Sequence, residues 1–191
     1  MATRTAYQLK LSLNDMNPPI WRRLLVDPRA TLSHLHRVIQ VTMDWMGYHL
    51  HEFQLGDVIY GPQCLNGGGF GPPARSELTR ISTILTRESP RMRYEYDFGD
   101  GWEVLIRLER ELEVNRNTRL PKCMGGARHG PLEDSGGPNG YQELVTTLKE
   151  PNNRDSKDVR EWPPVGFDPD DFEIKDVNSK LRDEFPLRKR V

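Results

Sequence analysis

The chain has 191 residues, and its 27 lysines and arginines nearly balance its 28 aspartates and glutamates, which leaves a formal net charge of −1. This balance argues against a dedicated polyanion-binding protein, which would carry a clear basic excess. Two widely separated cysteines, Cys64 and Cys123, exclude a disulfide framework, and no apolar run is long enough to cross a membrane. Because the amino terminus lacks the apolar core of a signal peptide, we expect one cytoplasmic domain over residues 1–191, with a flexible tail over 186–191.

Two strands and a helix are predicted first. Apolar and polar residues alternate over residues 7–13, which predicts a strand, and a second strand over 20–26 follows a proline-containing turn, so the two are expected to form a hairpin. The apolar spacing then changes to three and four residues, which predicts an amphipathic helix with Thr31 as its N-cap and Gly47 as its end. The apolar face of this helix would contain Leu32, Leu35, Val38, Ile39, Thr42, Met43 and Met46. Two histidines that flank this face are expected on the helix surface: His34 and His36.

The middle of the chain predicts a strand, a glycine-rich excursion and a short helical turn. Residues 49–55 alternate, so His49 and His51 would share one face of the strand. Residues 61–73 include three consecutive glycines and interrupt the pattern, and a helical turn is expected over 81–85.

A second hairpin is predicted around Asp100 and Gly101, which can supply the two positive-φ residues of a type I′ turn. The cross-strand pairs that this turn predicts are Asp97–Val104, Glu95–Ile106 and Gly99–Trp102. The carboxylates of Glu95 and Asp97 would then share a partly apolar face, opposite the aromatic residues of the same strand. Such carboxylates indicate a site or a buried hydrogen-bond network, and the alternative is an ordinary sheet with one partly hydrated face.

The second half predicts a long ordered loop and two helices. Residues 120–140 are rich in glycine, proline and polar side chains, which is typical of a loop. One helix is expected between residues 138 and 151, and another begins near residue 168. The apolar face of the last helix would contain Ile174, Val177 and Leu181. Sheet first and helices later indicate an α+β fold, with an antiparallel sheet of hairpins packed against the N-terminal amphipathic helix and further C-terminal helices.

Two histidines and an aspartate form the candidate metal site. His49 and His51 lie two residues apart, so both rings could reach one ion from the same strand face. Asp97 could complete a mixed nitrogen and oxygen site for a divalent metal ion. The alternative is that hydrogen bonds hold the histidines, which is the more frequent role of buried histidines.

A candidate binding groove is expected where the histidine strand, the second hairpin and the loop of Cys123 meet. Its predicted contact residues are Tyr96, Trp102 and Cys123. Cys123 could instead be a nucleophile with His129 as its base, or a structural thiol. Glu133 and Asp134 could cap the following helix or present carboxylates to a ligand.

Eight motifs follow one another along the chain. They are YQLKL at 7–11, PIWRR at 19–23, LHRVIQ at 35–40, HLHEF at 49–53, YDFGDGW at 96–102, PKC at 121–123, EDSGG at 133–137 and FDPDDF at 167–172. In this order they resemble the plasmid pRiA4b ORF-3-like family of bacterial and archaeal proteins. The resemblance implies a compact α+β domain and no established catalytic role. Some relatives are described as transposon passengers or resolvase-like proteins, which implies an association with mobile elements.

The chain departs from the family pattern in two places. Val104 stands where the family commonly has a histidine, which in the predicted register would face Asp97. Residues 128–132 replace an Ala-Cys-Pro-Pro segment, so a second loop cysteine is missing and His129 lies close to its position. Both departures remove a potential metal ligand or acid–base partner.

Three functions from different classes are compatible with these residues. The leading hypothesis is a non-catalytic binding or interaction module for a protein or small-molecule ligand. The alternative is a metal-dependent hydrolase that uses His49, His51 and Asp97, with Glu133 or Asp134 as a further acid. A nucleic-acid accessory protein of a mobile element is the third, although the charge balance disfavours nucleic acid and no motif indicates a recombinase.

Overall fold

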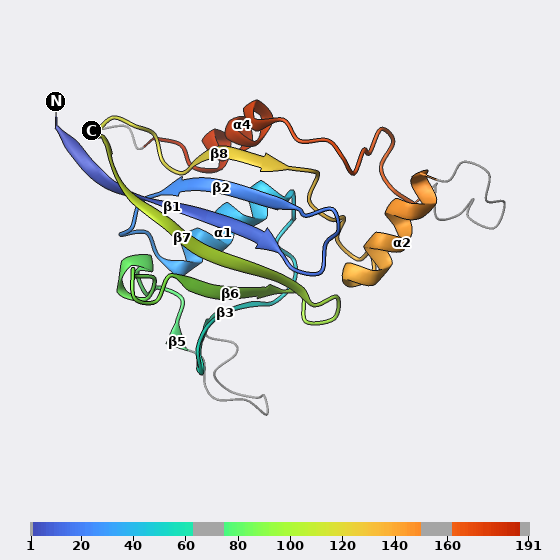
Figure 1. Ribbon diagram of the computed structural model, residues 1–191, viewed down its shortest axis with the longest axis horizontal. Coiled ribbons are helices and arrows are strands. Elements are labelled where there is room, and N and C mark those ends of the chain that lie inside the picture. Colours follow the sequence, from blue (N-terminus) through green and yellow to red (C-terminus); the bar gives the residue numbers. More distant parts are fainter. Residues whose placement is uncertain (1, 63–74, 150–161, 188–191) are drawn as a thin grey trace.

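The computed structural model describes residues 2–62, 75–149 and 162–187, and shows one eight-stranded sheet with helices beside it (Figure 1). The strands are β1 (Thr3–Leu13), β2 (Trp21–Val26), β3 (His51–Leu55), β4 (Val58–Gly61), β5 (Arg75–Ser76), β6 (Arg91–Tyr96), β7 (Trp102–Asn115) and β8 (Lys122–Ala127). The helices are α1 (Leu32–Met43), α2 (Gly137–Lys149) and α4 (Ile174–Glu184), with one 3₁₀ turn, η2 (Ile81–Thr83). The predicted α+β class is therefore confirmed.

The sheet is antiparallel except at one edge. Its strand order is β5-β4-β3-β6-β7-β1-β2-β8, and the β4–β5 pair at that edge is parallel. The predicted opening hairpin is confirmed, because β1 pairs with β2 from Tyr7 opposite Val26 to Ser12 opposite Trp21. The long strand β7 lies on the other side of β1 and joins this hairpin to β6.

Helix α1 follows the predicted apolar spacing. Thr31 is its N-cap, with the side-chain oxygen accepting a hydrogen bond of 3.2 Å from the His34 N–H. The helix ends at Asp44, which adopts a left-handed conformation, rather than at Gly47. Met46 consequently lies beyond the helix and is 66% exposed. The other six residues of the predicted face are buried, and five of them join residues of the sheet in the hydrophobic core: Leu32, Leu35, Val38, Ile39 and Met43.

The β6–β7 hairpin differs from the predicted one by its loop and register. Tyr96 pairs with Trp102, and Tyr94 pairs with Val104, so residues 97–101 form a five-residue loop. Asp97 itself has a φ of 57°, and its carbonyl accepts a hydrogen bond of 2.6 Å from the Gly101 N–H. The prediction of a tight turn at residues 100 and 101 was wrong. The buried tyrosines therefore share a face with Val104, whereas the glutamates of these strands lie on the other face.

The predicted loop over 120–140 contains a strand, β8, which pairs with β2. Its sequence hides the strand because two adjacent glycines are poor strand formers. Space explains Gly126, since an added Cβ would lie 2.5 Å from the Phe172 ring and 2.8 Å from the Trp21 carbonyl oxygen. The close packing of Phe172 and Trp21 thus requires glycine at a strand position where strand propensity disfavours it.

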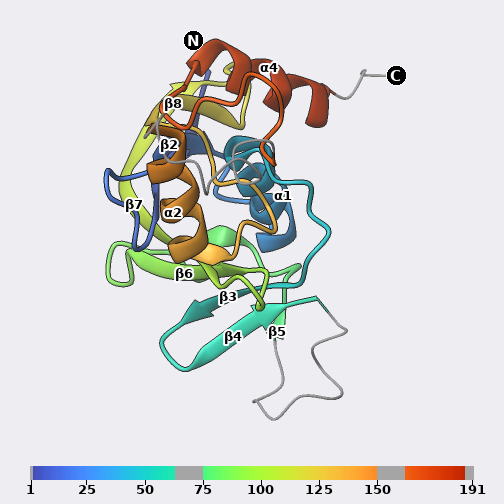
Figure 2. The same ribbon diagram turned by 90° about the vertical axis from the view of Figure 1, so that its right-hand side faces the viewer.

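The two later helices occupy different places. Figure 1 shows α2 beyond the ends of the central strands, and Figure 2 shows α4 running alongside β8. Helix α2 agrees with the prediction, but α4 begins at Ile174, six residues after the predicted start. Its predicted apolar face is confirmed, because Leu181 is buried and both Ile174 and Val177 pack against the core.

Some predictions concern residues outside the described ranges. They are most of the glycine-rich excursion, Cys64, and the end of the C-terminal tail. Among the residues that are described, no helix has the length and apolar character needed to span a membrane.

Candidate functional site

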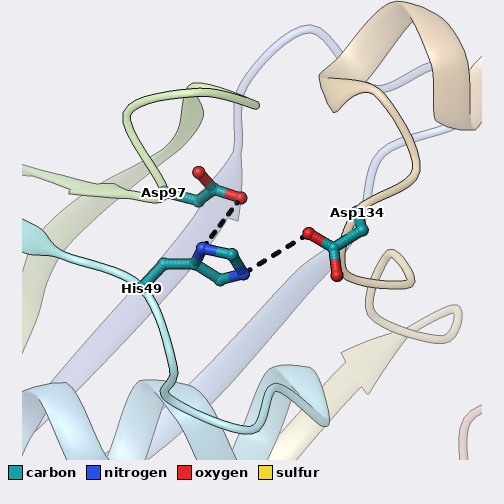
Figure 3. Close-up of side chains that lie close together, drawn as sticks. All are labelled: His49, Asp97 and Asp134. Carbon is teal, nitrogen blue, oxygen red and sulfur yellow. Dashed lines mark ion pairs between the residues drawn. The ribbon is translucent and has the colours of Figure 1, made fainter.

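Three segments that are distant in sequence meet beside the end of β6. They are the segment that follows α1, the β6–β7 loop, and the loop that precedes α2. His49 lies between two carboxylates (Figure 3): its Nδ1 is 3.5 Å from Asp97 Oδ2, and its Nε2 is 3.5 Å from Asp134 Oδ1. These three residues are called the His49 cluster below.

The backbone of the β6–β7 loop fixes the Asp97 carboxylate. The backbone N–H of Asp97 donates a hydrogen bond of 2.9 Å to the Leu50 carbonyl, which connects the loop to the segment that carries His49. Its Oδ1 accepts hydrogen bonds from the N–H groups of Gly99, at 3.0 Å, and Asp100, at 3.4 Å. This local bonding stabilises a left-handed aspartate, and it leaves Oδ2 directed at His49.

The loop before α2 is attached to the segment after α1 at two points. The Trp45 Nε1–H donates a hydrogen bond of 3.0 Å to the Pro131 carbonyl. The Glu133 carboxylate accepts a hydrogen bond of 2.7 Å from the Met46 N–H through Oε2. Its other oxygen, Oε1, accepts one from the Tyr96 hydroxyl. The next residue, Asp134, has a φ of 58° and a side chain that is 76% exposed.

Close backbone packing brings this loop against the β6–β7 loop. Gly137 has a φ of 68°, and a Cβ added there would lie 2.2 Å from the Asp100 carbonyl oxygen. Only glycine fits such a contact without a shift of the main chain. The distance between the two carboxylates of the His49 cluster therefore depends on a glycine contact.

Tyr96 lies beneath the His49 cluster. Its ring is fully buried and stacks on Trp45 with 5.0 Å between ring centroids. The His49 N–H donates to its hydroxyl at 3.4 Å, and the hydroxyl donates to Glu133. Burial raises the pKa of Tyr96 well above its ordinary value, and the hydrogen bond to Glu133 adds to this effect. The phenol is therefore a neutral donor that connects His49 to a carboxylate.

His51 does not join His49. It stacks on His36 with ring centroids 3.6 Å apart, and its Nε2 lies 3.1 Å from Glu77 Oε2. The prediction of a shared strand face was wrong because β3 begins at His51, which leaves His49 in the preceding segment. His36 is not a simple surface residue either, since its Nδ1 lies 2.8 Å from the Tyr94 hydroxyl.

The three residues predicted to contact a ligand are all inside the protein. Tyr96, Trp102 and Cys123 each have an exposed fraction of 0%. Tyr96 and Trp102 are cross-strand partners, whereas Cys123 lies on β8 rather than in a loop. Burial raises the pKa of the Cys123 thiol. The imagined base, His129, instead lies 3.5 Å from Asp44 through its Nε2.

The surroundings of residue 104, where the family commonly has a histidine, also differ from those predicted. Val104 is fully buried and pairs with Tyr94, so a side chain there points into the core. The predicted contact with Asp97 across the strands was wrong. The sequence named Asp134 as a helix cap, a ligand contact or a further acid of a hydrolase, but not as one of the predicted metal ligands.

The His49 cluster has the composition of a metal site. Within the part of the chain that the structure describes, it is the group of three ligand-type side chains whose potential ligand atoms all lie within 4.8 Å of one another. One imidazole and two carboxylates suit divalent transition metals. The imidazole lies between the carboxylates, with one nitrogen toward each, so a bound ion would use one nitrogen and the carboxylate on the other side would have to move.

Comparison with known proteins agrees with the sequence motifs. The family model described as "Plasmid pRiA4b ORF-3-like protein" matches residues 5–176. Uncharacterized protein y4hQ of Sinorhizobium fredii (strain NBRC 101917 / NGR234) is 36% identical over 155 residues, which are 81% of this chain and 79% of that protein. A protein of unknown function from Methanosarcina mazei Go1, MM3350, has a crystal structure with a TM-score of 0.82 and 37% identity, over 91% of this chain and 97% of its own. Neither description states an activity.

Proposed function

This chain belongs to the plasmid pRiA4b ORF-3-like family, and we propose that it is a binding module that holds a divalent metal ion at the His49 cluster. The observation that carries the proposal is the convergence of one imidazole and two carboxylates from three separate segments. The carboxylates of Asp97 and Asp134 supply the negative charge that a dication requires. A three-residue ligand set leaves coordination positions open, at which an oxygen donor of a small molecule or a partner protein would bind.

The sequence placed His49 and His51 in one metal site, whereas the proposal gives them different roles. His49 would be a metal ligand, whereas His51 would be held by Glu77 and His36 in a hydrogen-bonded and stacked core network. The pKa of His51 is lowered, chiefly by burial, so its ring is neutral at pH 7. Asp134 would replace it in the ligand set.

Metal content and thermal stability test the proposal directly. The purified, untagged protein is stripped with a chelator, and Zn²⁺, Mn²⁺ or Co²⁺ is added. We expect about one ion per chain, and an ion at about 100 times its Kd adds about 2.7 kcal/mol, which corresponds to a rise of roughly 5–10 °C in Tm. A stripped protein whose Tm is unchanged by all three ions would refute a metal site.

Three variants locate the site. Asp134→Asn removes a ligand charge but keeps a side chain that tolerates the left-handed backbone, so it should abolish the Tm rise. Asp15→Asn is the matched control, because Asp15 is also exposed and has a φ of 57°. His51→Gln should lower the Tm of the metal-free protein and leave metal binding in place. Equal metal responses in the Asp134 and Asp15 variants would contradict the proposed ligand set.

A metal-dependent hydrolase is a second candidate, and one contact favours it. The Tyr96 hydroxyl links the His49 N–H to the Glu133 carboxylate, so a proton acceptor stands next to the proposed ligands. In such an enzyme the metal activates water and a carboxylate takes its proton. Metal-dependent turnover of a p-nitrophenyl ester or phosphodiester, lost in Glu133→Gln with metal content intact, would support it. Absence of turnover in the metal-loaded protein would leave the binding module.

A further inference from the structure

A second candidate site lies away from the His49 cluster, along the outer strand of the sheet. A cavity of about 790 Å³ opens between β8 with the residues before it and helix α4. Drug-sized ligands occupy pockets of about 300–1,000 Å³, so the cavity has the volume of a small-molecule site. It is called the β8–α4 cleft below.

Charge in the β8–α4 cleft is of one sign. The described residues that line it include four with basic side chains and none with an acidic one. The basic residues are Arg119, Lys122, Lys175 and Arg182. No ion pair neutralises any of these four side chains within the described part of the chain. The formal net charge of the whole protein is only −1, so the excess of positive charge in this cleft is local. A positively charged cleft favours an anionic ligand.

Helix α4 separates this cleft from a cavity of mixed charge. Lys175 and Arg182 share the helix face that borders the β8–α4 cleft, where their spacing of seven residues is two turns. A neighbouring side of the helix borders a cavity of about 350 Å³, which is lined by Asp176 and Asp183 among others. Asp176 and Asp183 thus line the other cavity rather than the cleft, and Glu184, the remaining acidic residue of the helix, forms an ion pair with Arg37.

Part of the cleft is held in place by hydrogen bonds. Arg119 donates to the carbonyl oxygens of Arg182, at 2.6 Å, and Phe185, at 3.0 Å, which fixes one guanidinium nitrogen at the end of α4. The Asn178 amide accepts from the Cys123 N–H at 2.9 Å and donates to the Cys123 carbonyl at 2.9 Å. These bonds join α4 to the edge of β8.

The same bonds restrict what can bind. Because Asn178 occupies the outward backbone groups of Cys123, a peptide cannot extend the sheet by pairing there. Apolar side chains from both walls complete the cleft, including Pro121, Met124 and Ile174. A ligand must therefore offer an apolar body as well as negative charge. A nucleic-acid backbone meets the second condition but not the first.

We propose that the β8–α4 cleft binds an organic anion, namely a small molecule that carries a carboxylate, phosphate or sulfonate group on an apolar body. The anionic group contacts the lysines and arginines at the rim, and the apolar body lies against Pro121, Met124 and Ile174. Charge-assisted hydrogen bonds from Lys and Arg to such oxyanions are about twice as strong as neutral ones. The site is independent of the proposed metal ion, so either proposal can fail alone.

The test uses a pair of fluorescent probes with and without a charge. The anion is 8-anilinonaphthalene-1-sulfonate, and its neutral counterpart is N-phenyl-1-naphthylamine, which has the same rings without the sulfonate. We expect one saturable site for the anion and an affinity for the neutral probe that is about tenfold lower, the effect of losing one charge-assisted contact. Equal affinities for the two probes would overturn the proposal.

A charge-removing variant places the probe in the cleft. Lys122 and Lys175 are both exposed, so the double variant Lys122→Gln, Lys175→Gln should fold normally, and it should bind the anion about tenfold more weakly. Its control is Arg91→Gln, Arg107→Gln, which removes the same charge from two exposed cross-strand neighbours on β6 and β7. Equal anion affinity in the two double variants would overturn the assignment to this cleft.

Two further measurements complete the test. If the lysine variant fails to fold, the salt dependence of the wild-type protein decides, because added NaCl should weaken binding of the anion and not of the neutral probe. No salt effect would overturn the proposal. A fluorescein-labelled single-stranded oligonucleotide that displaces the anion and loses affinity in the lysine variant would overturn it in favour of nucleic acid.

Discussion

The two candidate sites are built in different ways. The His49 cluster depends on loops: Asp97, Asp134 and Gly137 all adopt left-handed conformations, and Gly137 lies in close contact with the Asp100 carbonyl. The β8–α4 cleft lies between a strand and a helix, and the Asn178 amide of the helix forms hydrogen bonds with both backbone groups of Cys123. The first site is therefore sensitive to main-chain changes, whereas the second tolerates substitutions of its exposed side chains.

The largest effect is expected at the loop contact of the His49 cluster. In Gly137→Ala the new methyl group meets the Asp100 carbonyl and a positive φ, so we expect a loss of about 3 kcal/mol in the free energy of unfolding, together with loss of metal response. Gly101→Ala is the control, because its φ is 69° but no atom lies within 4 Å of the added Cβ. It should cost only about 1 kcal/mol. Urea denaturation measures both, and equal losses would show that the contact is unimportant.

The next effect concerns the histidine pair beside the cluster. Burial lowers the pKa of His36 to about 3, with His51 adding to the effect, and burial lowers the pKa of His51 as well. Below an unfolded-state pKa of about 6.5, the unfolded chain binds protons that the folded chain does not, so stability is full above that pH and is lost as the pH falls. The loss from His36 is at most about 1.4 kcal/mol per pH unit.

Unfolding measurements at pH 7.5, 6 and 5 test this sign. His36→Gln removes one titrating group, so its stability should fall less steeply with acid than that of the wild-type protein. A parallel fall in the two proteins would mean that His36 is protonated in the folded state. That result would also weaken the distinction between His51 in the core and His49 in the site.

A smaller effect is expected for the hydrogen bonds that connect β8 to α4 beside the cleft. Asn178→Ala leaves the Cys123 N–H and carbonyl without their side-chain partners, which should lower the free energy of unfolding by about 1.5 kcal/mol. It should also weaken anion binding and leave the metal response unchanged. Ser179→Ala, one residue further along α4, is the matched control. A metal response that changes in Asn178→Ala would show that the two sites are coupled.

The comparison also explains how much of the molecule the sequence predicts. Helix α1 and the opening hairpin were predictable because their apolar spacing matches the geometry of the element. The β6–β7 register was not, because Asp97 adopts a left-handed conformation while its N–H bonds the Leu50 carbonyl, which is a tertiary contact. Strand β8 was hidden because packing of Phe172 requires a glycine at 126.

The difference between local sequence patterns and tertiary contacts also explains which residues of the candidate sites were predictable. The sequence named His49 and Asp97, whose chemistry is visible in isolation, but grouped them with His51, which is near in sequence rather than in space. Asp134 joins them only through the packing of two loops. The charged rim of the β8–α4 cleft combines residues about 60 positions apart in the chain, and no local pattern could indicate it.

The smallest effect is expected at Asp44, the residue at the end of α1. Asp44 contacts helix α4 and also the loop that precedes α2. Its carboxylate bonds Lys180 of α4 at 2.6 Å and lies 3.5 Å from His129 of the loop that leads to Asp134. The hydrogen bond to Asp44 raises the pKa of His129. The stabilising charge is therefore full below the unfolded-state value of about 6.5 and is lost as the pH rises through the raised folded value.

This contact is partly exposed, so its contribution should be below about 1 kcal/mol. The stability of the wild-type protein should fall between pH 6 and 8.5 by that amount relative to Asp44→Asn, in which the left-handed backbone is retained but the charge is gone. Urea titrations of both proteins at the two pH values measure it. A difference of the opposite sign would mean that His129 is neutral when folded, and the loop of Asp134 would then depend on its hydrogen bonds with Trp45 and Met46.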